Sequence, residues 1–335
     1  MDRSSLISSQ PERQFFPLVS VIILNYNGKE FLEPCLKSVL NSDYPNFEVV
    51  LVDNGSTDGS LHFVKDKFGK DPHLRVIANS ENLGFVMGNT IGIQHSKGDL
   101  LVILNNDTEA TPNWLKELIR TTLSNPRNGI CVCNIFTPNL PEGLLGHMDK
   151  YGRAVLVKLS DVLEKNGEII AAGPAFLIRR EVFEKIGGYD LRYFAYFDDM
   201  DLSWRAKLLG YRTTVAENSK VSHKLAGTTS RLGLSMRRYL TYRNTLRTLV
   251  KNYSFSTLVK TLPISLTLIL LESMALTYTF KNISLLLPPI KAILWNVKNF
   301  EDTWALHKEV QKSRVIDDAT IQQIMAPFRP LRRMP

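Results

Sequence analysis

Two carboxylates follow apolar, strand-like segments and have the chemistry to bind a phosphorylated ligand. Asp53 closes the segment FEVVLVD before the polar turn NGSTDGS, and Asp107 follows the segment LVILNN. Backbone N–H groups where a polar turn meets a helix suit a sugar–phosphate, and a carboxylate beside them can accept from a base N–H or a ribose hydroxyl. Asp107 can hold Mg²⁺ or Mn²⁺ against a diphosphate, because hard cations take oxygen ligands. Taken alone, Asp53 also fits an ordinary turn and Asp107 a helix N-cap.

A third group of carboxylates lies in FDDMDLSWR, where Asp198, Asp199 and Asp201 stand within four residues at a predicted helix start. The helix dipole stabilises acidic residues in a first turn, so a purely structural role is one explanation. Like charges this close are nevertheless unfavourable unless one is protonated or a cation or substrate lies nearby. Asp198 and Asp199 point in different directions on a first helical turn, so one can face a cleft while the other caps the helix. The flanking segment 195–197 adds aromatic surface on which a sugar can stack.

His223 closes the apolar stretch VSH, downstream of these three carboxylates. A lone histidine is more often structural than a metal ligand. Its place after a strand-like segment makes His223 a candidate ligand all the same.

Alternating strands and helices must position these residues. Buried, β-branched runs predict strands at 18–24, 47–53, 74–78, 100–104 and 130–134. Helices are predicted at 30–40, from 58 or 60, at 85–95, at 112–123 with Pro112 in the first position, and at 199–209. The alternation predicts an α/β fold, an open and mostly parallel, Rossmann-like sheet with right-handed crossovers and flanking helices. Ligands bind outside the carboxyl ends of such strands, which is where Asp53 and Asp107 lie.

The net charge of +8 is unevenly distributed along the 335 residues. Residues 1–220 carry 24 basic and 27 acidic side chains, whereas residues 221–335 carry 17 and 6. This asymmetry argues against a uniformly basic nucleic-acid binder, so we expect no nucleic-acid partner. Three cysteines are too few for a disulfide framework and predict reduced thiols.

The order of the motifs carries more information than any one of them. The sequence contains, in this order, VSVIILNYNG, VVLVDNGSTDGS, NSENLGFVMGNTIGI, LVILNNDTEATPNWL, GGYD, YFDDMDLSWRAKLLGYR, VSH and YRN. These stretches span about two thirds of the chain, from 19 to 244. The chain therefore resembles family 2 glycosyltransferases, which are inverting enzymes of the GT-A fold. It looks most like the branch that contains rhamnosyltransferases and other cell-surface polysaccharide enzymes.

This resemblance implies roles for single residues. Asp199 matches the second residue of the family's Glu-Asp pair and would be the general base. Asp107 would coordinate the cation, and His223 would complete its shell. The donor would be bound by Asn25, Asp53, Asn82, Gly84, Asn89, Asn106 and Asp107. The acceptor would contact Asp198, Trp204 and Gly173.

Two departures from the family pattern bear on these roles. The metal motif, usually written D-x-D, begins here with Asn105, which leaves Asp107 as the main ligand. The Glu-Asp pair is Asp198-Asp199 in this chain, so either carboxylate could be the base, and alignment with the following Asp-Leu favours Asp199.

The implied reaction is transfer of a hexosyl or rhamnosyl group from a dTDP- or UDP-linked sugar to a hydroxyl of a glycan or lipid-linked acceptor. It would invert the anomeric centre, use Mg²⁺ or Mn²⁺, and serve cell-surface polysaccharide synthesis. A sugar nucleotidyltransferase is an alternative, but it would need a glycine-rich, basic loop where NYNG stands. An inactive nucleotide-sugar-binding scaffold would have lost the catalytic carboxylates, whereas Asp107 and Asp199 are both present.

The C-terminal part combines basic and apolar residues. The stretch 235–253 is a basic helix with apolar spacing, and 262–280 is an apolar run with Pro263 and Glu272 inside it. Its 19 residues would just span a bilayer, but a central acid costs about 2.5–3.5 kcal/mol on insertion. We therefore favour helices lying in the membrane plane over a true span. The next apolar piece, 283–295, is expected to be broken by Pro288-Pro289.

These patterns predict three regions: a disordered tail at 1–16, a catalytic domain at 17–228, and a helical, membrane-associating extension at 229–335. Basic residues of the extension would contact an anionic leaflet, each contributing about 1 kcal/mol. We expect the protein on the cytoplasmic face of the cell membrane, peripheral or monotopic. The alternative for the apolar helices is homo-oligomer formation.

Overall fold

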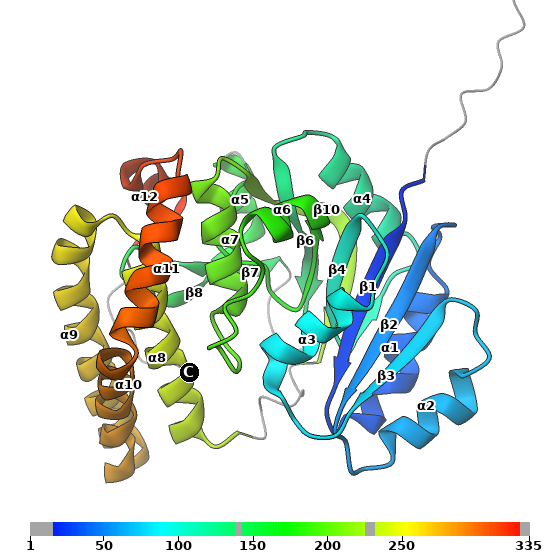
Figure 1. The fold of residues 1–335 in the computed structure, drawn as a ribbon, viewed down its shortest axis with the longest axis horizontal. Coiled ribbons are helices and arrows are strands. Elements are labelled where there is room, and N and C mark those ends of the chain that lie inside the picture. Colours follow the sequence, from blue (N-terminus) through cyan, green and yellow to red (C-terminus); the bar gives the residue numbers. More distant parts are fainter. Residues whose placement is uncertain (1–15, 138–142, 166, 225–231, 329–335) are drawn as a thin grey trace, which may run out of the picture.

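A computed structural model of the chain describes residues 16–137, 143–165, 167–224 and 232–328 (Figure 1). Its centre is an eight-stranded sheet with the order β3-β2-β1-β4-β9-β6-β10-β5. The strands are β1 (Val19–Asn25), β2 (Phe47–Asn54), β3 (Leu74–Asn79), β4 (Leu100–Asn105), β5 (Thr108–Ala110), β6 (Asn128–Phe136), β9 (Ala175–Arg179) and β10 (Arg212–His223). The predicted tail lies outside the described residues except for Phe16.

Most neighbouring strands run parallel, which confirms the predicted α/β sheet. β1 is parallel to β2 and β4, β2 to β3, and β6 to β10. β9 lies antiparallel between β4 and β6, and β5 is antiparallel to β10. A separate hairpin, β7 (Leu144–Met148) with β8 (Ala154–Lys158), follows β6. The fold is therefore a mixed α/β fold.

Helices cover both faces of the sheet and contact it through alternate residues of each strand. One face is covered by α1 (Lys29–Leu40), α2 (Ser60–Phe68) and α4 (Trp114–Leu123), and the other by α3 (Gly84–Gln94) and α7 (Asp198–Leu208). Val21 and Ile23 of β1 pack with Leu36 of α1, whereas Ile22 faces Val86 of α3. This alternation is the period-two pattern expected of a strand buried on both sides.

Two predicted details of the helices are wrong. α4 begins at Trp114, with Asn113 at the N-cap, so Pro112 is not its first residue. The reason is that the Thr111 N–H still donates to the Lys220 carbonyl at 3.2 Å, which keeps the chain tied to β10 before the helix can start. Pro288-Pro289 do not break a helix but lie in the first turn of α10 (Leu287–Lys298), where proline is tolerated.

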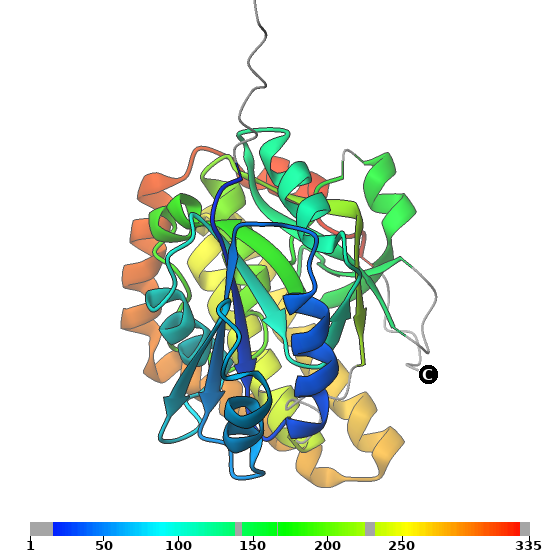
Figure 2. The same cartoon turned by 90° about the vertical axis from the view of Figure 1, so that its right-hand side faces the viewer.

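The C-terminal helices gather at the end of the molecule opposite to β2 and β3, as the yellow to red ribbons of Figure 1 show. They are α8 (Leu234–Asn252), α9 (Phe255–Phe280), α10, α11 (Phe300–Ser313) and α12 (Asp318–Ile324). The turned view in Figure 2 places the blue strands in front of these helices. Leu249 and Tyr253 share one hydrophobic cluster with Trp204 and Ile170 of the sheet side. The predicted boundary at 228 falls outside the described residues and stays a prediction.

A buried histidine joins the end of α12 to the β7–β8 hairpin. The His147 Nε2–H donates to the Ile324 carbonyl at 2.8 Å, and its Nδ1 accepts the Met148 N–H at 2.8 Å. These two bonds use the neutral form of the ring. Burial lowers the pKa of His147 to about 4, because the charged imidazolium loses its hydration.

Stability should therefore fall in acid through His147. Between pH 6.5 and about 4 the unfolded chain takes up a proton at this ring that the folded chain does not, so the contribution present above pH 6.5 is lost as the pH falls. We expect a loss of about 3 kcal/mol by pH 4.5. Urea unfolding at pH 7 and 4.5 should show a smaller loss in His147→Gln, and the full loss in the exposed control His62→Gln. Equal losses in both variants would contradict this assignment.

Candidate functional site

The carboxyl ends of β1, β2 and β4 bring three of the predicted donor residues together. The Asn25 Nδ2 donates to Asp53 Oδ2 at 3.1 Å, and the Asn25 Oδ1 accepts from Asn106 Nδ2 at 2.7 Å. All three side chains are buried, and the Asp53 Oδ1 also accepts the Ser56 N–H at 2.9 Å. Parallel pairing places Asn25 opposite Asp53 in neighbouring strands, which is why residues far apart in the sequence meet. The arrangement holds a carboxylate at a sheet edge where backbone N–H groups begin a turn.

Gly28, at the N-cap of α1, lies close against this network and was not singled out by the sequence. A Cβ at this position would overlap the Asn106 amide and lie 2.7 Å from the Asn25 Oδ1. The glycine therefore lets the start of α1 approach the strand ends. Its place directly after NYN is the sequence signal that could have identified it.

A second asparagine network shapes the start of α3. The Asn54 Nδ2 donates to the Asn82 Oδ1 at 3.0 Å and to the Gly84 carbonyl at 3.1 Å. Asn54 itself was not among the predicted residues, although it directly follows Asp53. The Asn89 Nδ2 donates to the Phe85 carbonyl at 2.9 Å, while its buried Oδ1 has no hydrogen-bond partner among the described residues.

Asp107 and His223, the two predicted cation ligands, face each other across the sheet edge. Their Oδ1 and Nε2 atoms lie 3.2 Å apart, because β10 pairs with β5 directly after Asp107 and places His223 opposite Thr108. Among the described residues no group of three or more His, Cys, Asp or Glu is placed to hold a metal ion. Mg²⁺ is ordinarily held by one or two protein ligands together with waters and phosphate oxygens. One carboxylate and one imidazole therefore fit a divalent cation that a diphosphate helps to bind.

The three carboxylates of α7 have three different environments. The Asp199 Oδ2 accepts the Gly173 N–H at 3.0 Å, and its Oδ1 accepts the Met200 N–H at 2.8 Å. Burial, and then the neighbouring Asp199, raise the pKa of Asp198 well above its usual range. Asp201 is fully buried and forms ion pairs with Arg205 and Lys251, both at 2.8 Å. Asp201 is therefore structural, Asp198 favours its protonated form, and Asp199 is a fixed hydrogen-bond acceptor.

The loop before β9 lies beside both groups of carboxylates. The Asn105 N–H donates to the Pro174 carbonyl at 2.9 Å, and the adjacent Gly173 binds Asp199. Gly173 has a φ of +71°, and the space where a side chain would stand is open. Together with His223, this loop lines a cavity of about 190 Å³ whose other walls are mainly apolar. The predicted acceptor residue Gly173 is thus beside an open cavity next to Asp199.

Trp204, the other predicted acceptor residue on α7, does not lie at the site. Its side chain has no exposed surface and packs edge-on against Tyr253, with ring centroids 4.6 Å apart. The indole belongs to the hydrophobic core, so we correct its assignment to a packing role. Its position on α7, facing the C-terminal helices, is the physical reason.

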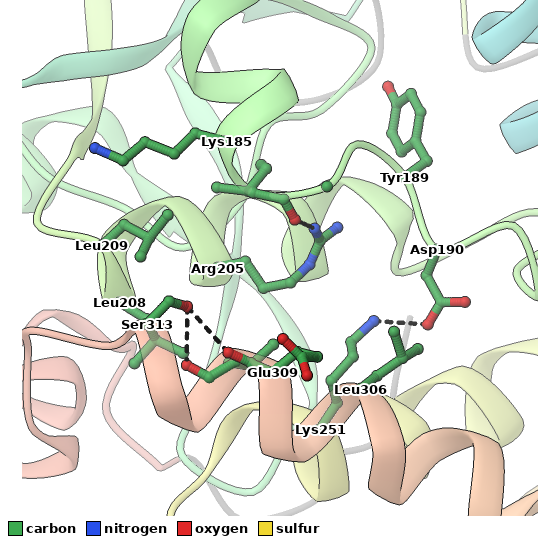
Figure 3. Close-up of a pocket in the computed structure, with 13 residues that line it drawn as sticks. Lys185, Tyr189, Asp190, Arg205, Leu208, Leu209, Lys251, Leu306, Glu309 and Ser313 are labelled. Atoms are coloured by element: carbon green, nitrogen blue, oxygen red, sulfur yellow. Dashed lines mark hydrogen bonds and ion pairs between the residues drawn. The ribbon is translucent and has the colours of Figure 1, made fainter.

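A larger cavity of about 320 Å³ lies between α7, α11 and the loop after α6 (Arg180–Lys185), and is shown in Figure 3. None of the predicted site residues lines it. Three of its charged side chains bind within the protein: Lys251 contacts Asp190 at 2.7 Å, and Arg205 donates to the Ile186 carbonyl at 2.5 Å (Figure 3). We therefore interpret it as a gap above an ion-paired core and place the functional site at the strand ends.

Ligands bind at the carboxyl ends of the strands in such α/β sheets, and the comparisons give the family. The family model described as "Glycosyl transferase family 2" matches residues 20–187, half of the chain. The chain belongs to glycosyl transferase family 2. Its relatives include the O-antigen biosynthesis protein RfbC of Myxococcus xanthus, 27% identical over 62% of this chain. They also include the glycosyltransferase AglE of Haloferax volcanii, 27% identical over 60% of this chain.

These relatives are longer than the matched region. The chain covers 17% of RfbC and 65% of AglE, less than two thirds of either protein. Among solved structures, GalNAc-T7 with UDP, GalNAc and Mn²⁺ has a TM-score of 0.62 at 22% identity, covering 73% of this chain and 49% of that one. The mannosyltransferase PcManGT of Pyrobaculum calidifontis, in complex with GDP-Man and Mn²⁺, has a TM-score of 0.55 at 18% identity and covers 94% of this chain and 86% of its own. These likenesses identify the fold, which is GT-A-like.

Proposed function

We propose that this protein is an inverting glycosyltransferase that moves a hexosyl or rhamnosyl group from a dTDP- or UDP-linked sugar to a hydroxyl group. The observation that carries the proposal is the position of the loop 173–174. It contacts the strand end before Asp107 on one side and binds Asp199 on the other. His223, which contacts Asp107, and Gly173, whose N–H binds Asp199, both line one cavity, in a chain of this family.

The donor would lie across the ends of β1, β2 and β4. Asp53 and Asn25 would bind the nucleoside, the amide network around Asn82 would shape its pocket, and Asp107 with His223 would hold Mg²⁺ or Mn²⁺. The cation, when bound, offsets the charge that develops on the departing diphosphate. The solved neighbours support a nucleotide-linked donor with a divalent cation, since they contain UDP or GDP-Man together with Mn²⁺.

Asp199 would accept the proton of the acceptor hydroxyl as its oxygen attacks the anomeric carbon. The bond from that carbon to the diphosphate breaks on the opposite face, so the configuration inverts and a nucleoside diphosphate leaves. A carboxylate has about four lone-pair sites, so the two N–H groups bound by Asp199 still leave room for this proton. The acceptor would be a glycan or lipid-linked molecule of cell-surface polysaccharide synthesis, which agrees with the name of RfbC.

A donor-hydrolysis screen tests this proposal. The full chain is incubated with UDP-, dTDP- and GDP-sugars, with Mn²⁺, Mg²⁺ or a chelator, and the released nucleoside diphosphate and sugar anomer are measured. We expect cation-dependent release from one nucleotide class, with inverted configuration. Pyrophosphate release from a nucleoside triphosphate and a sugar phosphate would instead identify a nucleotidyltransferase. Nucleotide binding with no turnover of any donor or acceptor would identify a scaffold.

We also propose that α9 and α10 dock on the anionic, cytoplasmic face of the cell membrane. The buried face of α9 includes the hydroxyl residues Thr261, Ser265 and Ser273, whereas Leu271 and Met274 are exposed. Leu258 and Ile269 are buried as well, so α9 carries apolar residues on both sides, unlike a soluble helix, whose outward side is polar. Among the described helices, α9 is also the one that is long and apolar enough to cross a membrane, and 28% of its most apolar 18-residue stretch is buried.

The positive charge for such docking comes from different residues than the sequence suggests. In α8, Arg247 and Lys251 are buried in ion pairs with Asp190, and Arg238 pairs with Glu272 of α9 at 2.7 Å. The exposed cations are instead lysines of α9, α10 and their connections, namely Lys260, Lys281, Lys291 and Lys298. Pairing with Arg238 also ties Glu272 to α8, which supports helices lying in the membrane plane.

Vesicle sedimentation without detergent tests this docking. Leu271→Asp/Met274→Asp should reduce binding to vesicles containing anionic lipid at least about tenfold, because each buried aliphatic side chain contributes roughly 1.5–3 kcal/mol. Leu123→Asp, which changes an exposed apolar residue on α4, should bind like the wild type. If the protein does not bind vesicles and forms a dimer through Leu271 and Met274, the homo-oligomer alternative is established instead.

A further inference from the structure

The turn that leads into α7 has an unfavourable backbone conformation directly before Asp198 and Asp199. Tyr196 and Phe197 have φ values of +69° and +65°. Side chains with a Cβ rarely adopt this left-handed region, and two in succession persist only where surrounding contacts hold them. Residues outside the turn must therefore hold its backbone in this conformation.

Asn244 of α8 supplies contacts that hold this turn. Its Nδ2 donates to the Ala195 carbonyl at 2.9 Å and to the Tyr196 carbonyl at 2.7 Å. Its Oδ1 accepts from the Arg243 Nε at 2.9 Å, which fixes the orientation of the amide. Asn244 has no exposed surface, so both of its N–H groups are committed to the turn. Asn244 is the last residue of the YRN motif, to which the proposed reaction gives no role.

The same face of α8 also holds the beginning of this loop. Arg247 and Lys251 bind Asp190, each at 2.7 Å, and the Lys251 contact is visible in Figure 3. Residues 244, 247 and 251 follow a spacing of three and four, which places them on one side of a helix. On its other side the loop contacts the donor half, since the Phe194 carbonyl accepts the Phe85 N–H of α3 at 2.7 Å. The loop 190–197 is thus fixed between α8 and the donor-side helix.

We propose that Asn244 is a positioning residue for the reaction: it holds the left-handed turn at 196–197 so that Asp199 keeps its bond to the Gly173 N–H. The inference rests on the proposed function, because it takes Asp199 as the base. Asn244 touches neither donor nor acceptor and acts through the backbone. Without its two bonds the turn relaxes toward ordinary φ values and the start of α7 moves away from Gly173.

Asn244→Ala should lower kcat about 10- to 100-fold, since small displacements of a catalytic group have effects of this size. The nucleotide Kd and the donor KM should stay within about twofold, because Asp53 and Asp107 are positioned by the sheet. The matched control is Asn296→Ala. Asn296 of α10 donates its Nδ2 to the carbonyl of Arg243, the neighbour of Asn244 in α8, at 3.0 Å and should leave kcat unchanged. If the alanine variant does not fold, Asn244→Ser, which keeps one donor, should give a smaller loss in kcat.

A double-mutant cycle separates positioning from packing. Glycine adopts the left-handed region without penalty, so Asn244→Ala should lower kcat less in a Tyr196→Gly background than in the wild type. Full additivity, an unchanged kcat, or an equal loss of nucleotide binding would each overturn the inference. Asp199→Asn is assayed alongside. If it is fully active, the assignment of the base fails, whereas an inactive Asp199→Asn beside a fully active Asn244→Ala refutes only the positioning role.

Discussion

Asp199→Asn is expected to reduce sugar transfer about 10²–10⁴-fold while donor binding survives. The amide oxygen of asparagine can still accept the Gly173 N–H, although the Met200 N–H then loses its side-chain acceptor. Asparagine cannot take a proton from the acceptor hydroxyl at neutral pH, and the loss therefore falls on the chemical step. Turnover at saturating donor and acceptor, together with calorimetric binding of the nucleoside diphosphate, measures both quantities.

Asp198→Asn is the matched control, because it changes the neighbouring carboxyl in the same way. The raised pKa of Asp198 means that this group favours its protonated form, which resembles an amide in charge and shape. We expect Asp198→Asn to lower kcat less than about tenfold, whereas loss of a general base lowers kcat about 10²–10⁴-fold. A fully active Asp199→Asn beside an inactive Asp198→Asn would exchange the roles of the two residues.

The second large effect is expected for Asp107. Asp107→Asn should lower cation-dependent transfer about 10²–10³-fold, because a bound cation contributes several kcal/mol of charge stabilisation and the carboxylate is its proposed main protein ligand. The concentration of Mn²⁺ that gives half-maximal turnover should rise in parallel. The measurement is a titration of activity with Mn²⁺ and Mg²⁺ at saturating donor.

His223→Gln gives the comparison for this prediction. It removes the second proposed ligand, whose Nε2 lies 3.2 Å from the Asp107 Oδ1, without changing the charge of the carboxylate. A rise in the half-maximal Mn²⁺ concentration that is smaller than for Asp107→Asn would fit one principal and one supporting ligand. If Asp107→Asn responds to Mn²⁺ like the wild type, the cation does not bind at this edge of the sheet.

The sequence predicted the sheet well because its strands are buried on both faces. Runs such as VSVIILN have no other stable place than a covered parallel sheet, and the residues that close them must meet at one edge. Asn25, Asp53 and Asn106 were therefore predictable as a group. The β7–β8 hairpin was harder, since its short strands with mixed burial carry a weak periodic signal.

Side chains whose environment depends on distant packing could not be assigned from the sequence. Trp204 lies one or two helical turns from Asp199, and its spacing alone does not say whether it faces the cleft or the C-terminal helices. The cations of α8 are a similar case. Their partners Asp190 and Asp201 lie about 50 to 60 residues earlier, so Arg247 and Lys251 could only be counted as surface charge. The amide bonds of Asn244 also depend on tertiary contact.

The buried ion pairs of α8 decide how this chain can be divided or recombined. Asp190 and Asp201 lie in the part of the chain that contains the proposed donor and base residues. Arg247 and Lys251 of α8 pair with Asp190, and Lys251 joins Arg205 in pairing with Asp201. Removing one partner of a buried pair typically destabilises a protein by about 3–5 kcal/mol, which is a large part of the stability of a domain. An exchange of C-terminal helices with another protein, as a route to a new membrane address or acceptor, would therefore have to carry an arginine and a lysine at the positions of Arg247 and Lys251. These buried ion pairs thus restrict which C-terminal helices can be combined with the sheet-containing part of the chain.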